Sequence, residues 1–468
     1  MPRQLGKKAK YASLAKAAAT STDKGAEMIT KTPTKAHLLK FALPTILSML
    51  IMSTFGIVDG IFVSRIIDPT ALAAVAIVFP FLSFVMALGF MLGVGGNAMI
   101  AKKIGEGKVV EGRQNFSLIV ITAFVVSILV AAIGFIAPYF IMNILGADER
   151  VHGMALEYMR PLLMFLPVIV LGMVFQQFLI TEGKAHISAI TAFVGGVTSA
   201  SLNFVLIYLM DMGLSGAALA TSIGYTLPAL VGLFYFTFRR KGNLYFVRPK
   251  FDIRALGRTC INGASEMVTM LATSIVAVIM NNILMRLDGM EATAAAAIMF
   301  AGMGIFTSLF IGYSSGIIPI ISYNFGKGDT DNLKRIYKNS LRMIGIISVS
   351  AVGLAFLSTN LLISIYDIPV GTSIHDMATF GFRALAVGFV LMGFNTFASM
   401  FFTALNNGLV SSFLSLFQTL IFPVAAFWIL PEIFGLTGAW VAIPTAEALS
   451  ILLTIVFFVK MRRRYGYA

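Results

Sequence analysis

Residues 100–116 read IAKKIGEGKVVEGRQNF and close a long apolar segment with a Gly-x-Gly turn and a charged loop. The same order of features returns at residues 321–337, which read ISYNFGKGDTDNLKRIY. The two segments start at 100 and 321, an offset of 221 residues. A repeat of this kind suggests that the chain contains two copies of one structural unit.

Two further matches support the duplication. GLSGAAL starts at residue 213 and GLTGAWV at residue 435, an offset of 222, and Arg160 and Arg383 are offset by 223. Three independent matches at nearly one offset indicate that the second half of the chain repeats the first.

The composition places both halves in a membrane. Of the 468 residues, 58% are hydrophobic and 12% are charged, whereas charged residues make up about 25% of a typical soluble domain. Continuous charge-free runs are long enough to cross a bilayer as helices, which takes about 20 residues; they cover residues 69–101, 114–147, 187–210, 292–326 and 384–431. Membrane-spanning strands would instead alternate apolar and polar residues, so helices are expected.

Polar junctions divide the chain into twelve predicted spans, six in each half. They lie near residues 38–64, 71–101, 115–145, 158–180, 187–210, 214–238, 259–285, 293–323, 343–366, 382–404, 411–430 and 436–459. Because six is even, both halves cross the membrane in the same direction, which predicts two six-helix bundles related by a pseudo-twofold axis along the membrane normal. The fold class is therefore all-α and integral to the membrane.

The domain boundaries follow from the charged segments between these spans. The predicted parts are a basic cytoplasmic tail (1–37), an N-terminal lobe (38–238), a cytoplasmic linker (239–258), a C-terminal lobe (259–459) and a second basic cytoplasmic tail (460–468). Substrate sites of duplicated transporters tend to lie at the interface of the repeats near the midplane, and rocking of one bundle against the other alternates access to them. The alternative is a membrane scaffold that transports nothing.

The net charge of +14 could suggest nucleic-acid binding, but the positions of the charges favour a topology signal. With the N-terminus in the cytoplasm, the tails and even-numbered junctions hold 30 of the 35 Lys and Arg residues. This asymmetry predicts that both termini are cytoplasmic. It also predicts contacts with anionic lipid head groups and no nucleic-acid partner.

Motifs for catalysis or cofactor binding are missing from the sequence. GEGKVV at residue 105 does not complete a phosphate-binding loop, and the four histidines are scattered near span ends. Cys260 is the single cysteine, so no cysteine metal cluster can form. The sequence thus predicts no enzyme, no metal and no cofactor, and transport would have to draw on an ion gradient, worth about 2.3 kcal/mol per charge and 100 mV.

Ionisable residues inside the spans are the leading candidates for function, because burying charge at membrane depth is costly. They are Asp59, Glu266 and Glu447. Glu266 lies near the cytoplasmic start of the seventh span, where an interfacial or capping role is an equal alternative. Glu447 follows Pro444 by one turn, so it is equally suited to bind the loosened backbone.

Asp59 lies in the outer half of the first span. Ser53, Gly56, Gly60 and Ser64 form a stripe of small residues at helical spacing, and such stripes face neighbouring helices. Asp59 is next to this stripe, so it is expected to face protein rather than lipid. Its alternative role is a protonated carboxyl that bonds to a neighbouring helix.

Amides within the spans could line a polar cavity. Gln177, Asn203 and Asn282 are the candidates, beside Gln176, Asn281, Asn395, Asn406 and Asn407; hydrogen bonding between helices is the commoner use of such residues. The 26 methionines and 40 phenylalanines suit a cavity that accepts varied flat apolar molecules, although most must pack helices or contact lipid.

Several of these segments together resemble the multidrug and toxic compound extrusion (MATE) transporters. They are FALPTILSMLIMSTFGIVDGIFVS from residue 41, QQFLITEGKAHIS from residue 176, GLSGAALATS from residue 213 and the two Gly-x-Gly loops. The resemblance extends over about residues 38–459. It implies a V-shaped fold of two six-helix lobes and export of amphipathic, often cationic, drug-like compounds in exchange for protons or sodium ions across the bacterial inner membrane.

The resemblance is closest to the bacterial DinF-type branch, whose first helix carries a proline and, fifteen residues later, a cation-coupling aspartate. Pro44 and Asp59 have that spacing, which implies that Asp59 couples transport to the ion and that Pro44, Gly56 and Gly60 act as hinge residues. The second acid of that branch is missing, because Ile207 stands one turn after Asn203. The NorM-type pattern, with an acid deep in the seventh span, is also poorly matched.

These observations predict a secondary active multidrug exporter that works by alternating access. Protons are favoured over sodium, because one buried carboxylate takes up a proton more readily than it builds a multi-oxygen ion site. A flippase for lipid-linked oligosaccharides is the related alternative, although basic residues would be expected in its cavity. A membrane scaffold or enzyme is the unrelated alternative.

Overall fold

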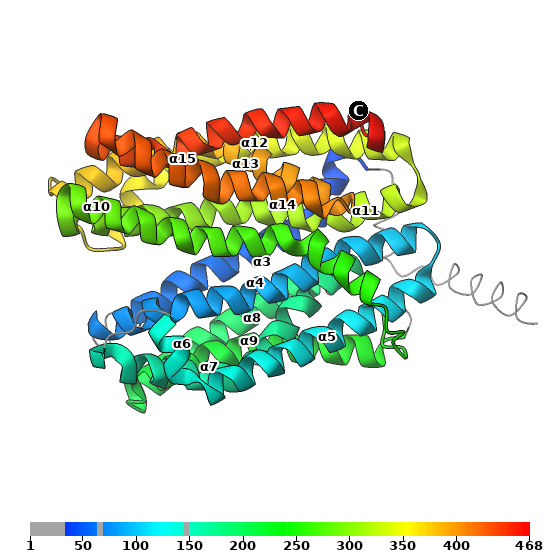
Figure 1. Ribbon diagram of the computed structural model, residues 1–468, viewed down its shortest axis with the longest axis horizontal. Coiled ribbons are helices and arrows are strands. Elements are labelled where there is room, and N and C mark those ends of the chain that lie inside the picture. Colours follow the sequence, from blue (N-terminus) through cyan, green and yellow to red (C-terminus); the bar gives the residue numbers. More distant parts are fainter. Residues whose placement is uncertain (1–32, 63–68, 145–148, 241) are drawn as a thin grey trace, which may run out of the picture.

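Helices make up the structure because a backbone at membrane depth must satisfy its own hydrogen bonds. The computed structural model describes residues 33–62, 69–144, 149–240 and 242–468, and no β-strand occurs in these ranges. The helices in chain order (Figure 1) are α3 (Lys35–Phe62), α4 (Pro69–Gly105), α5 (Val109–Ile136), α6 (Pro138–Ile144), α7 (Glu149–Thr181), α8 (Ala185–Asn203), η2 (Phe204–Leu209), α9 (Gly213–Phe238), α10 (Ile253–Gly316), α11 (Ile318–Lys327), α12 (Thr330–Ser364), α13 (Ser373–Ala404), α14 (Gly408–Leu416), η3 (Phe417–Ile421) and α15 (Phe422–Tyr465).

Ten helical stretches of the described chain are long and apolar enough to cross a membrane. Two of them contain a break. Helix α10 leaves helical geometry at Asp288 and Gly289, and α15 does so at Gly435. The glycines have φ values of +68° and +58°, a left-handed conformation that glycine adopts at little cost. Each break divides its stretch into two helices, which gives twelve long apolar helices in the described part of the chain, the number predicted.

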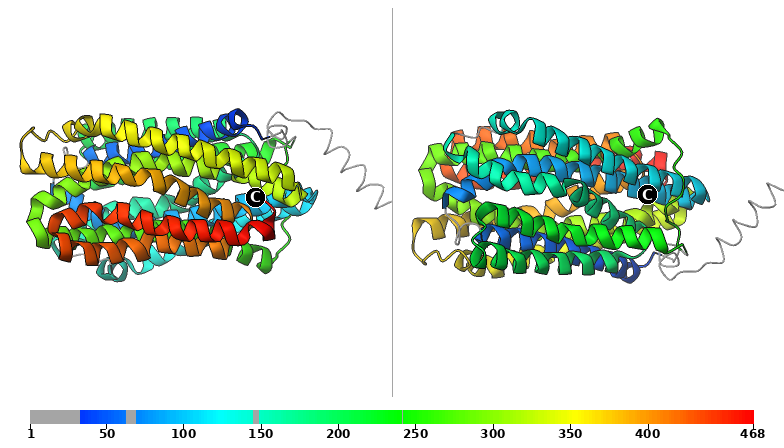
Figure 2. Two further views of the ribbon diagram at one scale, coloured as in Figure 1. Left: turned by 90° about the horizontal axis from the view of Figure 1, so that it is seen from above. Right: turned by 90° about the horizontal axis from the view of Figure 1, so that it is seen from below.

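The helices form two bundles, which we call the N-lobe (α3–α9) and the C-lobe (α10–α15). In Figure 1 the N-lobe, coloured blue to blue-green, lies below the C-lobe, which begins with the green α10 and ends in red, and both run along the long axis in each view of Figure 2. The backbone repeats as the sequence does. Gly107 and Gly328 have φ values of +75° and +73°, and Gly213 and Gly435 have +55° and +58°.

The lobes meet closely at one end of the molecule, the end at which α3 begins and α15 finishes, which we call the terminal end (Figure 2). A Cβ atom on Gly105 would collide with the carbonyl oxygen of Tyr323, and one on Gly326 would collide with that of Lys102. These four residues, the glycine seam, are two pairs with the same offset of 221. Each lobe thus contributes the same kind of contact, as in a twofold interface. Only glycine fits at positions 105 and 326, because any side chain would collide with the facing backbone.

Helix α3 crosses from one lobe to the other. Its first half, residues 38–46, contributes to the buried core of the C-lobe, and its later residues Met52 and Phe55 line a cavity of the N-lobe. The predicted boundary at residue 38 marks the start of this helix in sequence, but the first half of the helix packs in the other bundle.

Several N-lobe side chains bind the segment between the lobes, Ser117 among them, and we call two of these, Arg113 and Glu182, the linker clamp. Arg113 donates to the carbonyl of Asn243 at 2.8 Å and to the hydroxyl of Tyr245 at 2.7 Å. The buried Glu182 carboxylate accepts from the backbone amides of Asn243 at 2.7 Å and Leu244 at 3.0 Å. These hydrogen bonds fix the linker to the N-lobe.

Candidate functional site

Each lobe encloses a cavity. The N-lobe cavity has a volume of about 330 Å³. It is lined mainly by apolar and aromatic side chains from α3, α4, α7, α8 and α9: Met52, Phe55, Val75, Phe79, Leu82, Met86, Tyr158, Gln176, Ala192, Gly195, Gly196, Ser199, Asn203, Ala217, Thr221, Gly224, Tyr225 and Pro228. A large apolar cavity with a few polar groups is the usual form of a small-molecule site.

Close packing of α8 against α9 forms one wall of this cavity. A Cβ atom on Gly195 would collide with the backbone carbonyl of Gly224, so the two helices touch through their backbones. Asn203 lies at the end of α8, immediately before the π-helical turn η2. Its side chain is buried and lines the cavity.

Gln177 takes a different place from the one expected of a cavity residue. It is buried, and its side chain packs against the backbone of Gly93 on α4. The preceding residue, Gln176, lines the cavity instead. Two neighbouring residues of a helix point about 100° apart, so the sequence pattern of two adjacent amides could not select between them.

The residues proposed for ion coupling and hinge motion lie on α3. Pro44 is inside this helix. Gly56, Asp59 and Gly60 belong to its last turns, but their side-chain environment lies outside the described part of the chain. The assignment of Asp59 therefore stays a prediction.

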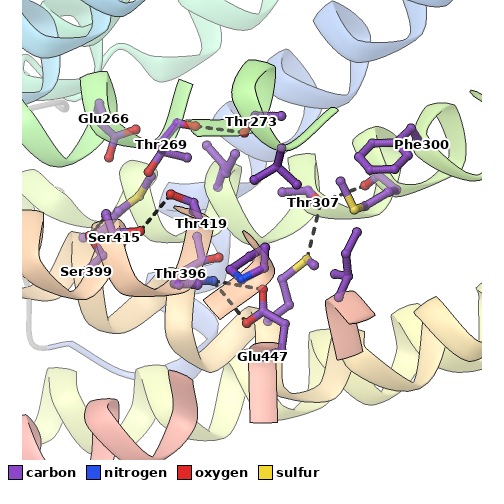
Figure 3. Close-up of a pocket in the computed structure, with 18 residues that line it drawn as sticks. Glu266, Thr269, Thr273, Phe300, Thr307, Thr396, Ser399, Ser415, Thr419 and Glu447 are labelled. Carbon is purple, nitrogen blue, oxygen red and sulfur yellow. Dashed lines mark hydrogen bonds between the residues drawn. The ribbon is translucent and has the colours of Figure 1, made fainter. Parts of the chain in front are cut away.

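The C-lobe cavity is smaller, about 130 Å³, and brings two predicted acids together (Figure 3). Glu266 enters it from α10 and Glu447 from α15. The other lining residues are rich in hydroxyl groups and methionine: Thr269, Thr273, Val276, Phe300, Met303, Thr307, Ile311, Met392, Thr396, Ser399, Met400, Ser415, Gln418, Thr419, Pro423 and Ile443. These acids are 181 positions apart in sequence, 266 against 447, so their proximity is a product of the fold.

Glu447 is embedded in an amide network. Its Oε2 atom accepts hydrogen bonds from Asn395 Nδ2 at 2.7 Å and Gln418 Nε2 at 3.2 Å. Asn395 is oriented in turn by Thr454, whose hydroxyl donates to its Oδ1 at 2.9 Å. Gln418 reaches the carboxylate from the π-helical turn η3, and such turns often occur at functional sites.

Glu266 has a different environment in the same cavity. It is only 8% exposed, and no hydrogen bond to its carboxylate is present among the described residues. Figure 3 shows it beside Thr269 at the opposite side of the cavity from Glu447. A buried carboxylate without donors is costly to keep charged, so this position suits a group that binds a proton or another cation.

Two residues mark the limits of the sequence prediction. Asn282 is exposed on the first half of α10 and lines neither cavity. Gln418 was missed, although it bonds Glu447. A single amide in a charge-free run carries no distinctive signal, and its partner is 29 residues away.

Comparisons with known proteins agree on one family. A family model described as MatE matches residues 44–227 and 266–428. The "Multidrug export protein MepA" of Staphylococcus saprophyticus is 24% identical over 432 residues, 91% of this chain and 94% of that protein.

Two solved structures have the same fold. One is described as "Crystal structure of MATE in complex with MaL6"; it has a TM-score of 0.88 and 23% identity and covers 95% of this chain and 99% of its own. The other is described as "Outward-facing conformation of a multidrug resistance MATE family transporter of the MOP superfamily", with a TM-score of 0.88 and 22% identity over 95% of this chain and 98% of its own.

Proposed function

The chain belongs to the MatE family of multi-pass membrane transporters, and from this premise we propose that it exports amphipathic, often cationic, organic compounds from a bacterial cell. The observation that supports the proposal most is the N-lobe cavity of about 330 Å³. Export is driven by protons, sodium ions being the alternative, and both termini lie in the cytoplasm.

The lining of the N-lobe cavity fits flat apolar molecules of varied shape. Phe55, Phe79 and Tyr225 offer aromatic faces to a substrate, and Met52 and Met86 offer flexible, polarisable side chains. Aromatic faces attract organic cations, while methionines adapt to different outlines. The polar groups of this cavity then orient the substrate without selecting one compound.

Asp59 is the proposed coupling residue. Met52, Phe55 and Asp59 follow one another at intervals of three and four residues along α3, and residues at such intervals share a helix face. This spacing supports a carboxylate near the N-lobe cavity, where uptake of a proton would compete with a bound cation. Protonation would also change the packing of α3 around Pro44 and so couple the ion to movement of the helix.

The charge of the two cavities argues against the flippase alternative. No Lys, Arg or His lines either cavity in the part of the chain that the structure describes. A site for an anionic lipid-linked sugar would need basic groups to bind its phosphates. The acids Glu266 and Glu447 favour a cationic substrate or a coupling ion instead.

Transport by purified protein in liposomes tests this function. The protein is reconstituted, a proton or a sodium gradient is imposed, and movement of a fluorescent organic cation is recorded. We expect the proton gradient to drive transport. Transport that responds only to sodium would refute proton coupling, and none under either gradient would refute ion-coupled export.

Asp59→Asn tests the coupling residue. The substitution keeps the size of the side chain but removes its titration, so we expect loss of proton-driven transport with binding of the fluorescent cation retained. Asp376→Asn, at an aspartate whose side chain is 75% exposed, is the control and should transport normally. An Asp59→Asn protein that transports at the wild-type rate would show that Asp59 has a structural role.

A further inference from the structure

A chain of hydroxyl groups leads away from the C-lobe cavity. Ser415 Oγ lies 2.8 Å from Ser399 Oγ, which lies 2.9 Å from Ser411 Oγ. Ser411 Oγ is 2.6 Å from Thr403 Oγ1, and a longer contact of 3.3 Å joins Thr403 to Ser265. Either oxygen of each pair can be the donor. We call these five residues the hydroxyl chain.

The hydroxyl chain differs from the usual arrangement of serine and threonine in helices. Ser450 and Thr359, for example, are buried and donate to the carbonyl four residues earlier in their own helix, which is the common local bond. In the hydroxyl chain, the side chains also bond to one another across α10, α13 and α14. These bonds come in addition to the backbone bonds that Thr403 and Ser411 donate to the Ser399 carbonyl, at 3.3 and 2.8 Å. All of its members are at most 4% exposed.

The two ends of the chain lie in different surroundings. At one end, Ser399 and Ser415 line the cavity that holds Glu266 and Glu447, the titratable groups of its lining. Toward the other end, the chain divides at Thr403. One branch is the contact with Ser265, which precedes Glu266 on α10, and on the other side Thr403 precedes the last residue of α13 and the partly exposed loop at Asn406. The chain therefore spans the packed region between an acidic cavity and the terminal end.

The side chain of Asn262, beside Thr403, has an oxygen that can accept a further hydrogen bond. Asn262 donates from Nδ2 to the Thr403 carbonyl at 2.9 Å, and its buried Oδ1 atom has no partner among the described residues. Buried polar atoms are nearly always paired, with protein or with water. An acceptor left open next to the last hydroxyls suits a transient water between Thr403 and the loop.

We propose that the hydroxyl chain conducts protons between the C-lobe cavity and the terminal end. This inference rests on the proposed proton-driven export. A proton from a cavity carboxyl reaches Ser415 or Ser399 through water in the cavity, and each hydroxyl that gains a proton passes its own to the next oxygen. The last proton leaves to water at the loop. Rotation of the hydroxyls restores the starting state, so one proton moves and no residue is altered.

Substitution of Thr403 tests the proposal. Thr403→Val keeps the shape of the side chain but removes the oxygen that two links share. Thr403→Ser restores the hydroxyl, and Thr359→Val makes the same chemical change at a buried threonine of the C-lobe outside the chain. Proteins are reconstituted with a trapped pH dye, and proton movement, transport of a fluorescent cation and its equilibrium binding are measured in H₂O and D₂O.

We expect Thr403→Val to slow proton movement and proton-driven transport by roughly 100-fold or more, in the range of positioned proton-transfer groups, with cation binding unchanged. Thr403→Ser and Thr359→Val should behave as wild type, and wild type should be slower in D₂O. Ser411→Ala, with Ser450→Ala as its control, makes the same test at the neighbouring hydroxyl. If Thr403→Val fails to fold, Ser411→Ala takes its place.

The results that overturn the proposal are distinct from those that overturn the proposed function. Wild-type rates in both Thr403→Val and Ser411→Ala would exclude conduction through the chain. If the variants and their controls were slowed equally, the cause would be a packing effect, and conduction through the chain would again be excluded. A wild-type protein that ignores the proton gradient would refute proton-driven export itself, and the conduction proposal with it.

Discussion

At the scale of single residues, Glu447 and Glu266 share one cavity but differ in their partners. Removal of the Glu447 side chain leaves the buried amide of Gln418 without its acceptor, while Asn395 keeps its bond to the Glu447 backbone carbonyl; an unsatisfied buried polar group costs about 1–3 kcal/mol. We expect Glu447→Ala to lower the free energy of unfolding by this amount, measured by denaturation in detergent. Glu266→Ala removes no such bond and should cost less; equal losses would contradict the network.

The sequence predicted both acids of the C-lobe cavity because charged residues are rare in the apolar runs. It did not predict how they differ. The partners of Glu447 come from α13 and from the π-helical turn η3, and only the packing of three helices brings them together. The exposure of Asn282 could not be predicted either, because an amide in an apolar run has the same local pattern whether it faces a cavity or the outside.

At the scale of elements, the linker clamp fixes the connection between the lobes to one of them. Arg113→Ala removes three hydrogen bonds, to Gly242, Asn243 and Tyr245, and the stacking of the guanidinium over Tyr245, 4.1 Å from the ring centroid. A loss of about 1–2 kcal/mol raises the population of an opened linker roughly 5–30-fold. We therefore expect trypsin to cleave the linker faster by a similar factor, at sites such as Arg248.

The matched control for this digestion is Lys108→Ala. Lys108 is also a basic residue near the start of α5, but it pairs with Glu106 at the surface and does not touch the linker. It should leave the rate of cleavage unchanged. If both variants were cleaved at the wild-type rate, the linker would be held by contacts other than the clamp.

The twelve helices themselves were predictable, because an apolar run of sufficient length has no other stable form in a bilayer. The two breaks were also visible as polar junctions near Asp288 and Gly435. The crossing of α3 into the C-lobe could not be predicted. The hydrophobicity of residues 38–46 indicates that they leave water, but it carries no information about which bundle they pack in.

At the scale of the whole molecule, the glycine seam closes the terminal end. A side chain at Gly105 would meet the backbone of Tyr323, and a backbone carbonyl cannot move aside as a rotamer can. We expect Gly105→Val to separate the lobes at this end. The measurement is the distance between spin labels on cysteines at Lys108 and Lys327, with Cys260 replaced by serine.

Gly257→Val is the control for the seam, because Gly257 is also near the terminal end, in α10, but a Cβ atom there meets nothing within 4 Å. In Gly257→Val, the distance between the two spin labels should equal that in the parent protein. An unchanged distance in Gly105→Val would mean that the lobes can meet at this end without the close approach of the two backbones.

The crossing of α3 has a consequence for the order in which the protein is assembled. Residues 38–46 enter the membrane early in synthesis, yet the C-lobe helices that α3 contacts are α10 and α12, which begin at residues 253 and 330, 215 and 292 positions after residue 38. Until then this half of α3 can face only lipid or the early helices. The N-lobe therefore reaches its final packing only after the second half of the chain has been inserted, and the ribosome must deliver both copies of the repeat before either is complete.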